Sequence, residues 1–139
     1  MTTNVVGRAE YKLAGALKAF KINLREKTVL DIGSSTGGFT EAALRAGARR
    51  VIAIEKGTKQ MKAPLCFDPR IDLREKTDIF DVALDDTEKP DVIVADVSFV
   101  SLEKVLWHAK KNLSRADTEF LVMLKPQFEA KPWQLRNGI

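Results

Sequence analysis

Three acidic residues that follow short apolar runs are the first candidates for chemistry. Asp31 stands two positions before Gly33, Glu55 ends a second run, and Asp78 follows a third. A carboxylate at the position of Asp31 suits a cationic ligand with an α-amino group. A carboxylate at the end of the second run, such as Glu55, can accept hydrogen bonds from both hydroxyls of a ribose. Asp78 could accept from the amino group of adenine. Amine, ribose and adenine together are parts of S-adenosylmethionine, so the three acids predict a site for that cofactor.

A glycine-rich turn directly follows the first run. The residues expected to bind the cofactor along it are Gly33, Ser34, Ser35, Thr36, Gly37, Gly38 and Phe39. Glycine permits tight turns, and backbone N–H groups at a helix start form a site for an anion or carboxylate. A plain tight turn is the alternative. A dinucleotide fingerprint would need glycine where Ser35 stands, and Asp31 would repel a pyrophosphate. Both observations disfavour a nicotinamide-dependent oxidoreductase, which stays as a less favoured hypothesis.

Three further residues are candidates for catalysis. Asp96 and Lys125 end two more apolar runs, and Lys12 lies beside the apolar stripe of an opening helix. Asp96 is also expected to bind the cofactor. In methyl transfer, an acceptor oxygen must be poised behind the methyl group, and positioning supplies roughly 7–11 kcal/mol of the barrier. Lys125 could act as base if its pKa fell from about 10.4 to about 7–8, or as a cation that stabilises the developing oxyanion. A structural Asp96–Lys125 ion pair and a solvated Lys12 are the alternatives.

The elements that must position these residues alternate along the chain. Strands are expected at 28–33, 50–55, 71–77, 91–96 and 120–125. A first helix is expected around Leu13, Leu17 and Phe20, whose apolar stripe should belong to the core. Further helices are expected at 38–45 and after Ser101, where Trp107 should be packed, and Pro64 should end a short helix after the second strand. This order predicts an α/β fold, an open doubly wound and mostly parallel sheet of about five strands with helices on both faces. The apolar fifth strand would be a sheet edge, either covered or able to pair with another copy.

Composition narrows the class of protein. With 139 residues, 45% hydrophobic and 30% charged, the chain fits one globular domain. It has no uncharged apolar run long enough to span a membrane, and one cysteine with one histidine predicts no metal cluster and a cytoplasmic protein. Residues 1–27 and 104–139 each carry a net charge of +4, and residues 28–103 carry −4. Basic ends gathered on one face would attract RNA.

Four motifs in order give this sequence a family resemblance. They are Arg8–Leu13, Leu30–Thr40, Ala95–Leu102 and Leu124–Ala130. The chain resembles the TlyA, or haemolysin A, family of the FtsJ-like ribosomal RNA 2′-O-methyltransferases. The resemblance covers nearly the whole chain. It implies a Rossmann-like methyltransferase fold, S-adenosyl-L-methionine as methyl donor, and ribosomal RNA or a ribosomal subunit as partner. The family's older name suggests a membrane-lytic role, but no spanning segment supports it, so no membrane partner is expected.

The resemblance also implies a Lys-Asp-Lys-Glu catalytic set. Lys12, Asp96 and Lys125 match its first three members, whereas Glu129 is not the fourth by position. Family members usually begin with an S4-type RNA-binding domain and continue for about two more strands. We therefore expect residues 1–139 to form a single methyltransferase domain without the S4 domain and with the C-terminal strands missing. A non-catalytic RNA-binding remnant of the family is the alternative function.

Overall fold

Five parallel strands form one sheet in the computed structural model, which describes residues 8–96 and 102–123. The strands are β1 (Thr28–Ile32), β2 (Arg50–Ile54), β3 (Ile71–Arg74), β4 (Val92–Ala95) and β5 (Glu119–Val122). Their order across the sheet is β3-β2-β1-β4-β5. This is the strand order of a Rossmann-like sheet. The five predicted strands are confirmed, although the third is shorter than expected.

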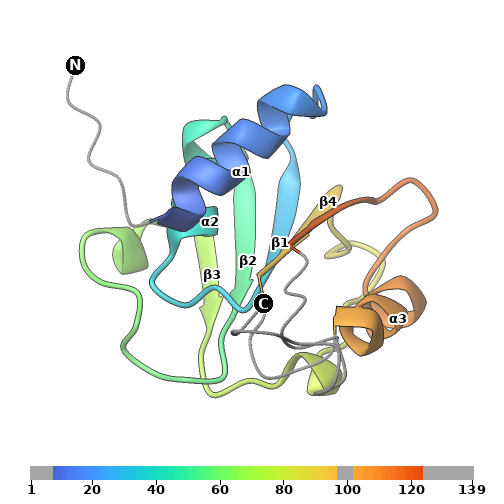
Figure 1. The fold of residues 1–139 in the computed structure, drawn as a ribbon. Coiled ribbons are helices and arrows are strands. Elements are labelled where there is room, and N and C mark those ends of the chain that lie inside the picture. Colours follow the sequence, from blue (N-terminus) through green and yellow to red (C-terminus); the bar gives the residue numbers. More distant parts are fainter. Residues whose placement is uncertain (1–7, 97–101, 124–139) are drawn as a thin grey trace, which may run out of the picture.

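Helices cover both faces of this sheet, as predicted. The helices α1 (Arg8–Ala19) and α2 (Gly38–Arg45) lie over one face, and α3 (Leu102–Asn112) lies over the other (Figure 1). Two short 3₁₀ helices, η1 (Leu65–Phe67) and η2 (Ile79–Asp81), flank β3 along the chain. Alternate residues of the central strands enter two separate cores, one under α1 and α2 and one under α3. Burial on both faces explains the near-continuous apolar runs of β1, β2 and β4.

The end of α1 corrects one prediction. Leu13 and Leu17 are buried as expected, but Phe20 is 69% exposed. The helix ends at Ala19, and Lys21 adopts a left-handed conformation with φ 55°. The N–H of Ile22 then donates to the carbonyl of Leu17 at 2.9 Å. The N–H of Phe20 still donates to the carbonyl of Ala16 at 2.9 Å, so the chain reverses directly after Phe20 and leaves its side chain uncovered in the final turn.

Two further local predictions were wrong. The segment between β2 and Pro64 forms bends and turns instead of a short helix, and Pro64 precedes η1. Lys59 lies in this segment with a left-handed φ of 55°, which an α-helix cannot contain. Trp107, expected to be packed, is 68% exposed because it lies on the outer side of α3, opposite the buried Leu102, Val105 and Ala109.

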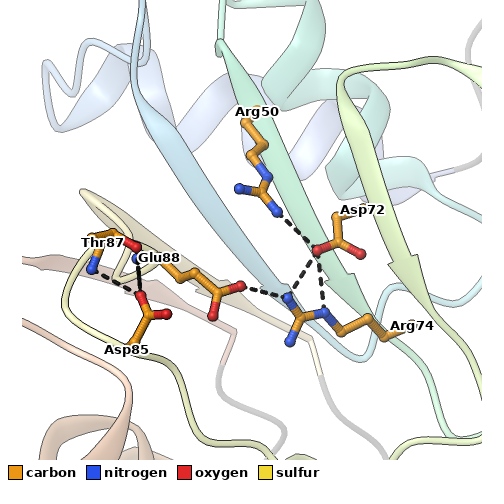
Figure 2. A network of polar contacts seen from close by, with 6 residues as sticks. All are labelled: Arg50, Asp72, Arg74, Asp85, Thr87 and Glu88. Carbon is orange, nitrogen blue, oxygen red and sulfur yellow. Dashed lines mark hydrogen bonds and ion pairs between the residues drawn. The ribbon is translucent and has the colours of Figure 1, made fainter.

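A polar network fixes the edge of the sheet at β3 (Figure 2). The carboxylate of Asp72 accepts from Arg50 at 2.9 Å and from Arg74 at 2.8 Å. Arg74 also donates to Glu88 at 2.9 Å, and the turn that carries Glu88 is capped by Asp85. The hydrogen bond from Arg74 lowers the pKa of Asp72. The network joins β2, β3 and the 85–88 turn, and thereby holds the strand that leads to Asp78.

At the opposite edge, β5 is the last strand among the described residues. Phe120, Leu121 and Val122 are half-buried there. Its pairing with a second copy stays a prediction.

Candidate functional site

The carboxyl ends of the strands meet in one row of residues. The N–H of Gly33 donates to the carbonyl of Ile54 at 2.9 Å, and that of Asp96 donates to Ile32 at 3.3 Å. The N–H of Met123 continues the row by donating to Ala95 at 2.8 Å. Since parallel strands share one register here, the residues that follow β2 and β4 flank the residue that follows β1. The fold therefore brings Glu55 and Asp96 to either side of Gly33.

The glycine-rich turn runs from β1 into α2 as predicted. Gly33 and Gly37 adopt positive φ values of 76° and 100°. Ser35, where a dinucleotide fingerprint would have its middle glycine, is also left-handed with φ 51°. A Cβ on Gly37 would lie 2.6 Å from the Leu65 side chain. Gly37 is thus required by both backbone conformation and packing against the segment that follows β2.

The other turn residues differ in exposure. Ser34 is buried, and its Oγ has no partner among the described residues. Thr36 is exposed, and Gly38 begins α2. Phe39 is buried in the core beneath α1 and α2, so its side chain serves packing. The N–H groups of Gly33, Ser34, Ser35 and Gly37 already donate within the protein. The turn can therefore offer a ligand the Ser34 hydroxyl and the N–H groups at the start of α2.

Asp31 is the most strongly perturbed group of the site. Its side chain is fully buried, and Oδ2 accepts from the Thr40 hydroxyl at 2.6 Å. Its Oδ1 has no hydrogen-bond partner among the described residues. The pKa of Asp31 is raised to about 7, chiefly by burial; hydrogen bonding by Thr40 opposes the rise, and the charges of Asp96 and Glu55 add to it. A buried carboxylate with one orphaned oxygen favours a cationic partner.

Thr40 was missed by the sequence analysis. It is fully buried on α2, and its hydroxyl is the described group that satisfies Asp31. The sequence signal was a hydroxyl residue three positions after Gly37 in the first turn of the predicted helix. That signal was weak, because threonine is unremarkable near the start of a helix.

Glu55 is held by donors from two segments. Its Oε1 accepts from the N–H of Ser35 at 2.8 Å. Its Oε2 accepts from the N–H of Gly57 at 2.7 Å and from the Gln60 amide at 3.5 Å. Gln60 was also missed by the sequence analysis, because nothing in the run 56–64 indicated that it folds back onto β2. The carboxylate is therefore fixed next to the glycine-rich turn.

Asp78 also lies at the carboxyl end of the sheet, beyond β3. The chain after β3 stays beside β2, where the N–H of Thr77 donates to the carbonyl of Glu55 at 3.0 Å. The Asp78 carboxylate caps η2 by accepting from the N–H of Phe80 at 3.0 Å. That hydrogen bond lowers the pKa of Asp78, and Lys56 lies 3.4 Å away. The carboxylate is thus ionised and partly exposed, and its contacts are with Phe80 and Lys56 rather than with Glu55 or Asp31.

Lys12 reaches the end of β5 from α1. Its Nζ lies 3.8 Å from the sulfur of Met123, the residue next to Asp96 in the row of strand ends. A cavity of about 280 Å³ opens between α1 and β5 and is lined by Lys12, Leu13, Ala16, Phe39, Leu121, Val122 and Met123. Lys125 and Glu129 lie outside the described residues. Lys12 therefore lies near the carboxyl ends of the strands, where Glu55 and Asp96 also lie, although α1 is the first helix of the chain.

The described part of the chain contains neither a metal-binding cluster nor a membrane-spanning helix. No group of three histidine, cysteine, aspartate or glutamate side chains within residues 8–96 and 102–123 could hold a metal ion. No helix among these residues has the length and apolarity needed to cross a membrane.

Two curated proteins are similar to this chain in sequence. The 16S/23S rRNA (cytidine-2′-O)-methyltransferase TlyA of Mycobacterium tuberculosis is 39% identical over 134 residues, which are 96% of this chain and 50% of that protein. Hemolysin A of Brachyspira hyodysenteriae is 38% identical, over 96% of this chain and 56% of its own. The chain thus spans about half the length of these curated relatives.

A solved structure gives the same result for the fold. A Lactococcus lactis protein that carries a hemolysin name superposes with a TM-score of 0.90 at 37% identity, covering 99% of this chain and 66% of its own. The family model described as FtsJ-like methyltransferase matches residues 5–139. The resemblance inferred from the four motifs is confirmed, and the chain belongs to the FtsJ-like methyltransferase family.

Proposed function

We propose that this chain carries the catalytic part of a methyltransferase that uses S-adenosylmethionine to methylate ribose 2′-hydroxyls of ribosomal RNA in the cytoplasm. The observation that supports this most is the acidic edge around Asp31, whose buried Oδ1 lacks a partner among the described residues. Glu55 and Asp96 add negative charge beside it. Such a site attracts a ligand with an ammonium and a sulfonium group and repels a pyrophosphate.

The residues at this edge fit each part of the cofactor. Asp31 would hold the ammonium group, the N–H groups of Gly38 and Phe39 at the start of α2 the carboxylate, and Glu55 the ribose hydroxyls. Asp78 would accept from the amino group of adenine, since its side chain is 36% exposed. When bound, S-adenosylmethionine supplies a methyl group made electrophilic by its positively charged sulfur.

Three side chains are proposed to act on the acceptor hydroxyl: Lys12, Asp96 and Lys125. Lys12 comes from α1 and Asp96 directly follows β4, yet the fold brings both to the same edge. Lys125 lies two residues after Met123, which contacts Lys12. A lysine acting as base would make methyl transfer faster as pH rises, whereas a lysine acting as cation would make it slower once the proton is lost.

RNA as substrate is supported by the outer face of α3. Trp107 is 68% exposed there, and Lys104 and Lys111 occupy positions three and four residues away on the same helix and are exposed. An exposed aromatic ring can stack on an unpaired base, and lysines can neutralise the adjoining phosphates. The basic segments at both ends of the chain add to this attraction.

Ligand binding and methyl transfer together test the proposal. S-adenosylhomocysteine should raise the melting temperature, because a ligand that binds only the folded state stabilises it. Labelled methyl groups should pass to 16S or 23S rRNA but not to an RNA with 2′-deoxyribose at the target. No shift at millimolar S-adenosylhomocysteine would contradict the cofactor assignment, and binding of NADH instead would favour an oxidoreductase. Salt-sensitive RNA binding without methyl transfer would favour the non-catalytic alternative.

A further inference from the structure

The Glu55 carboxylate is already engaged by protein donors. The N–H groups of Ser35 and Gly57 donate to its two oxygens at 2.8 and 2.7 Å. The Gln60 amide is a third donor, and its nitrogen lies 3.5 Å from Oε2. At this length the Gln60 hydrogen bond is the weakest of the three. The two backbone donors belong to turns that fix their positions, so the Gln60 side chain is the exchangeable partner.

Counting lone pairs favours this exchange. A carboxylate offers about four acceptor positions, and three are used by Ser35, Gly57 and Gln60. The two hydroxyls of a ribose need two acceptor positions if both donate to Glu55. One position is free while Gln60 stays, and two are free once its amide moves. A ribose bound through both hydroxyls therefore competes with the amide of Gln60 for one acceptor position.

We propose that Gln60 is a second ribose-binding residue, whose amide leaves Glu55 and binds a hydroxyl of the same diol. The proposal rests on the proposed function, because it requires a nucleoside ligand at Glu55. A primary amide both donates and accepts, so it complements a carboxylate that only accepts. The hydroxyl of Ser35 donates to Gln60 Oε1 at 3.3 Å and holds the amide beside the site.

Gly57 provides a second way to test the position of the Gln60 amide. A Cβ on Gly57 would lie 2.4 Å from Gln60 Nε2 and 3.1 Å from Glu55 Oε2. The backbone of Gly57 is outside the left-handed region, so alanine fits its conformation. The nearest obstacle is the far end of a flexible side chain. Gly57→Ala therefore moves the Gln60 amide and leaves Gln60 itself in the chain. Because Glu55 Oε2 must also give by a few tenths of an ångström, the result for Gly57→Ala is interpreted together with that for Gln60→Ala.

The experiment measures the affinity of S-adenosylhomocysteine by isothermal titration calorimetry for the wild-type chain, Gln60→Ala, Gly57→Ala and Thr58→Ala. Thr58 is exposed in the same turn and serves as the matched control. Loss of one neutral hydrogen bond predicts binding weaker by roughly three- to tenfold for the first two variants, and Thr58→Ala should match the wild type. Melting temperatures without ligand should be similar for all four proteins.

A second measurement assigns the effect to the ribose. The wild type should prefer adenosine to 2′-deoxyadenosine or 3′-deoxyadenosine, and Gln60→Ala should lose the preference at one hydroxyl. Wild-type affinity in both Gln60→Ala and Gly57→Ala, or an unchanged preference for adenosine in Gln60→Ala, would overturn the role of Gln60 and leave the proposed function standing. Absence of S-adenosylhomocysteine binding by the wild type would overturn the proposed function together with it.

Discussion

The substitution Asp31→Asn tests the electrostatic design of the site. Asn keeps the size of the side chain and an oxygen that can accept from the Thr40 hydroxyl at the position of the 2.6 Å hydrogen bond. It removes the negative charge, which is buried and lies near the charges of Asp96 and Glu55. The variant should therefore be more stable than the wild type without ligand and should fail to bind S-adenosylhomocysteine.

The size of the stability change follows from the raised pKa of Asp31. The pKa rises from 3.8 to about 7, a difference of about 3 pKa units. At about 1.36 kcal/mol per unit, ionising Asp31 in the folded state costs up to about 4 kcal/mol. The folded state holds the proton more tightly than the unfolded state. The cost is therefore absent below pH 4, grows as pH rises from 4 to 7, and is constant above 7.

Urea unfolding from pH 4 to 8 measures this difference. The free energies of unfolding of wild type and Asp31→Asn should coincide near pH 4 and diverge up to pH 7, with the variant more stable by up to about 4 kcal/mol at pH 8. Calorimetry with S-adenosylhomocysteine should show strong binding only for the wild type. A variant that is less stable than the wild type at pH 8, or a gap that does not change with pH, would refute the account of Asp31.

Three further predictions use other contacts of the structure. Binding of S-adenosylhomocysteine at pH 6 should release close to one proton, because its ammonium group favours ionised Asp31, whose pKa is about 7 in the free protein. Calorimetry in buffers of different ionisation enthalpy measures the number of protons released. Binding heats that are equal in all buffers would contradict the prediction. Lys12→Ala should abolish most methyl transfer while S-adenosylhomocysteine still binds, and Lys18→Ala, exposed on the same helix, should keep both. Arg74→Ala should cost about 1 kcal/mol at pH 7, because it removes partners of two partly exposed carboxylates. Since Arg74 lowers the pKa of Asp72, that cost should shrink as pH falls below 4; a constant cost in urea unfolding would mean that packing dominates.

Local patterns in the sequence determined the elements and the chemistry at their ends. The apolar runs predicted all five strands because β1, β2 and β4 are buried on both faces and β3 and β5 extend the same sheet. The glycines of the turn predicted its sharp reversal, since Gly33 and Gly37 need positive φ values. The acids at the strand ends predicted an edge for a cationic ligand. These features depend on a few neighbouring residues, so the sequence alone carries them.

Only the tertiary structure decided which side chains meet at the site. Thr40 and Gln60 reach Asp31 and Glu55 because α2 and the 56–64 segment fold back onto β1 and β2. Lys12 approaches the end of β5, more than one hundred residues away, because α1 crosses the sheet. The exposure of Trp107 likewise depends on which side of α3 the sheet covers. Contacts between residues far apart in the chain depend on the packing of whole elements, and spacing within one segment cannot predict them.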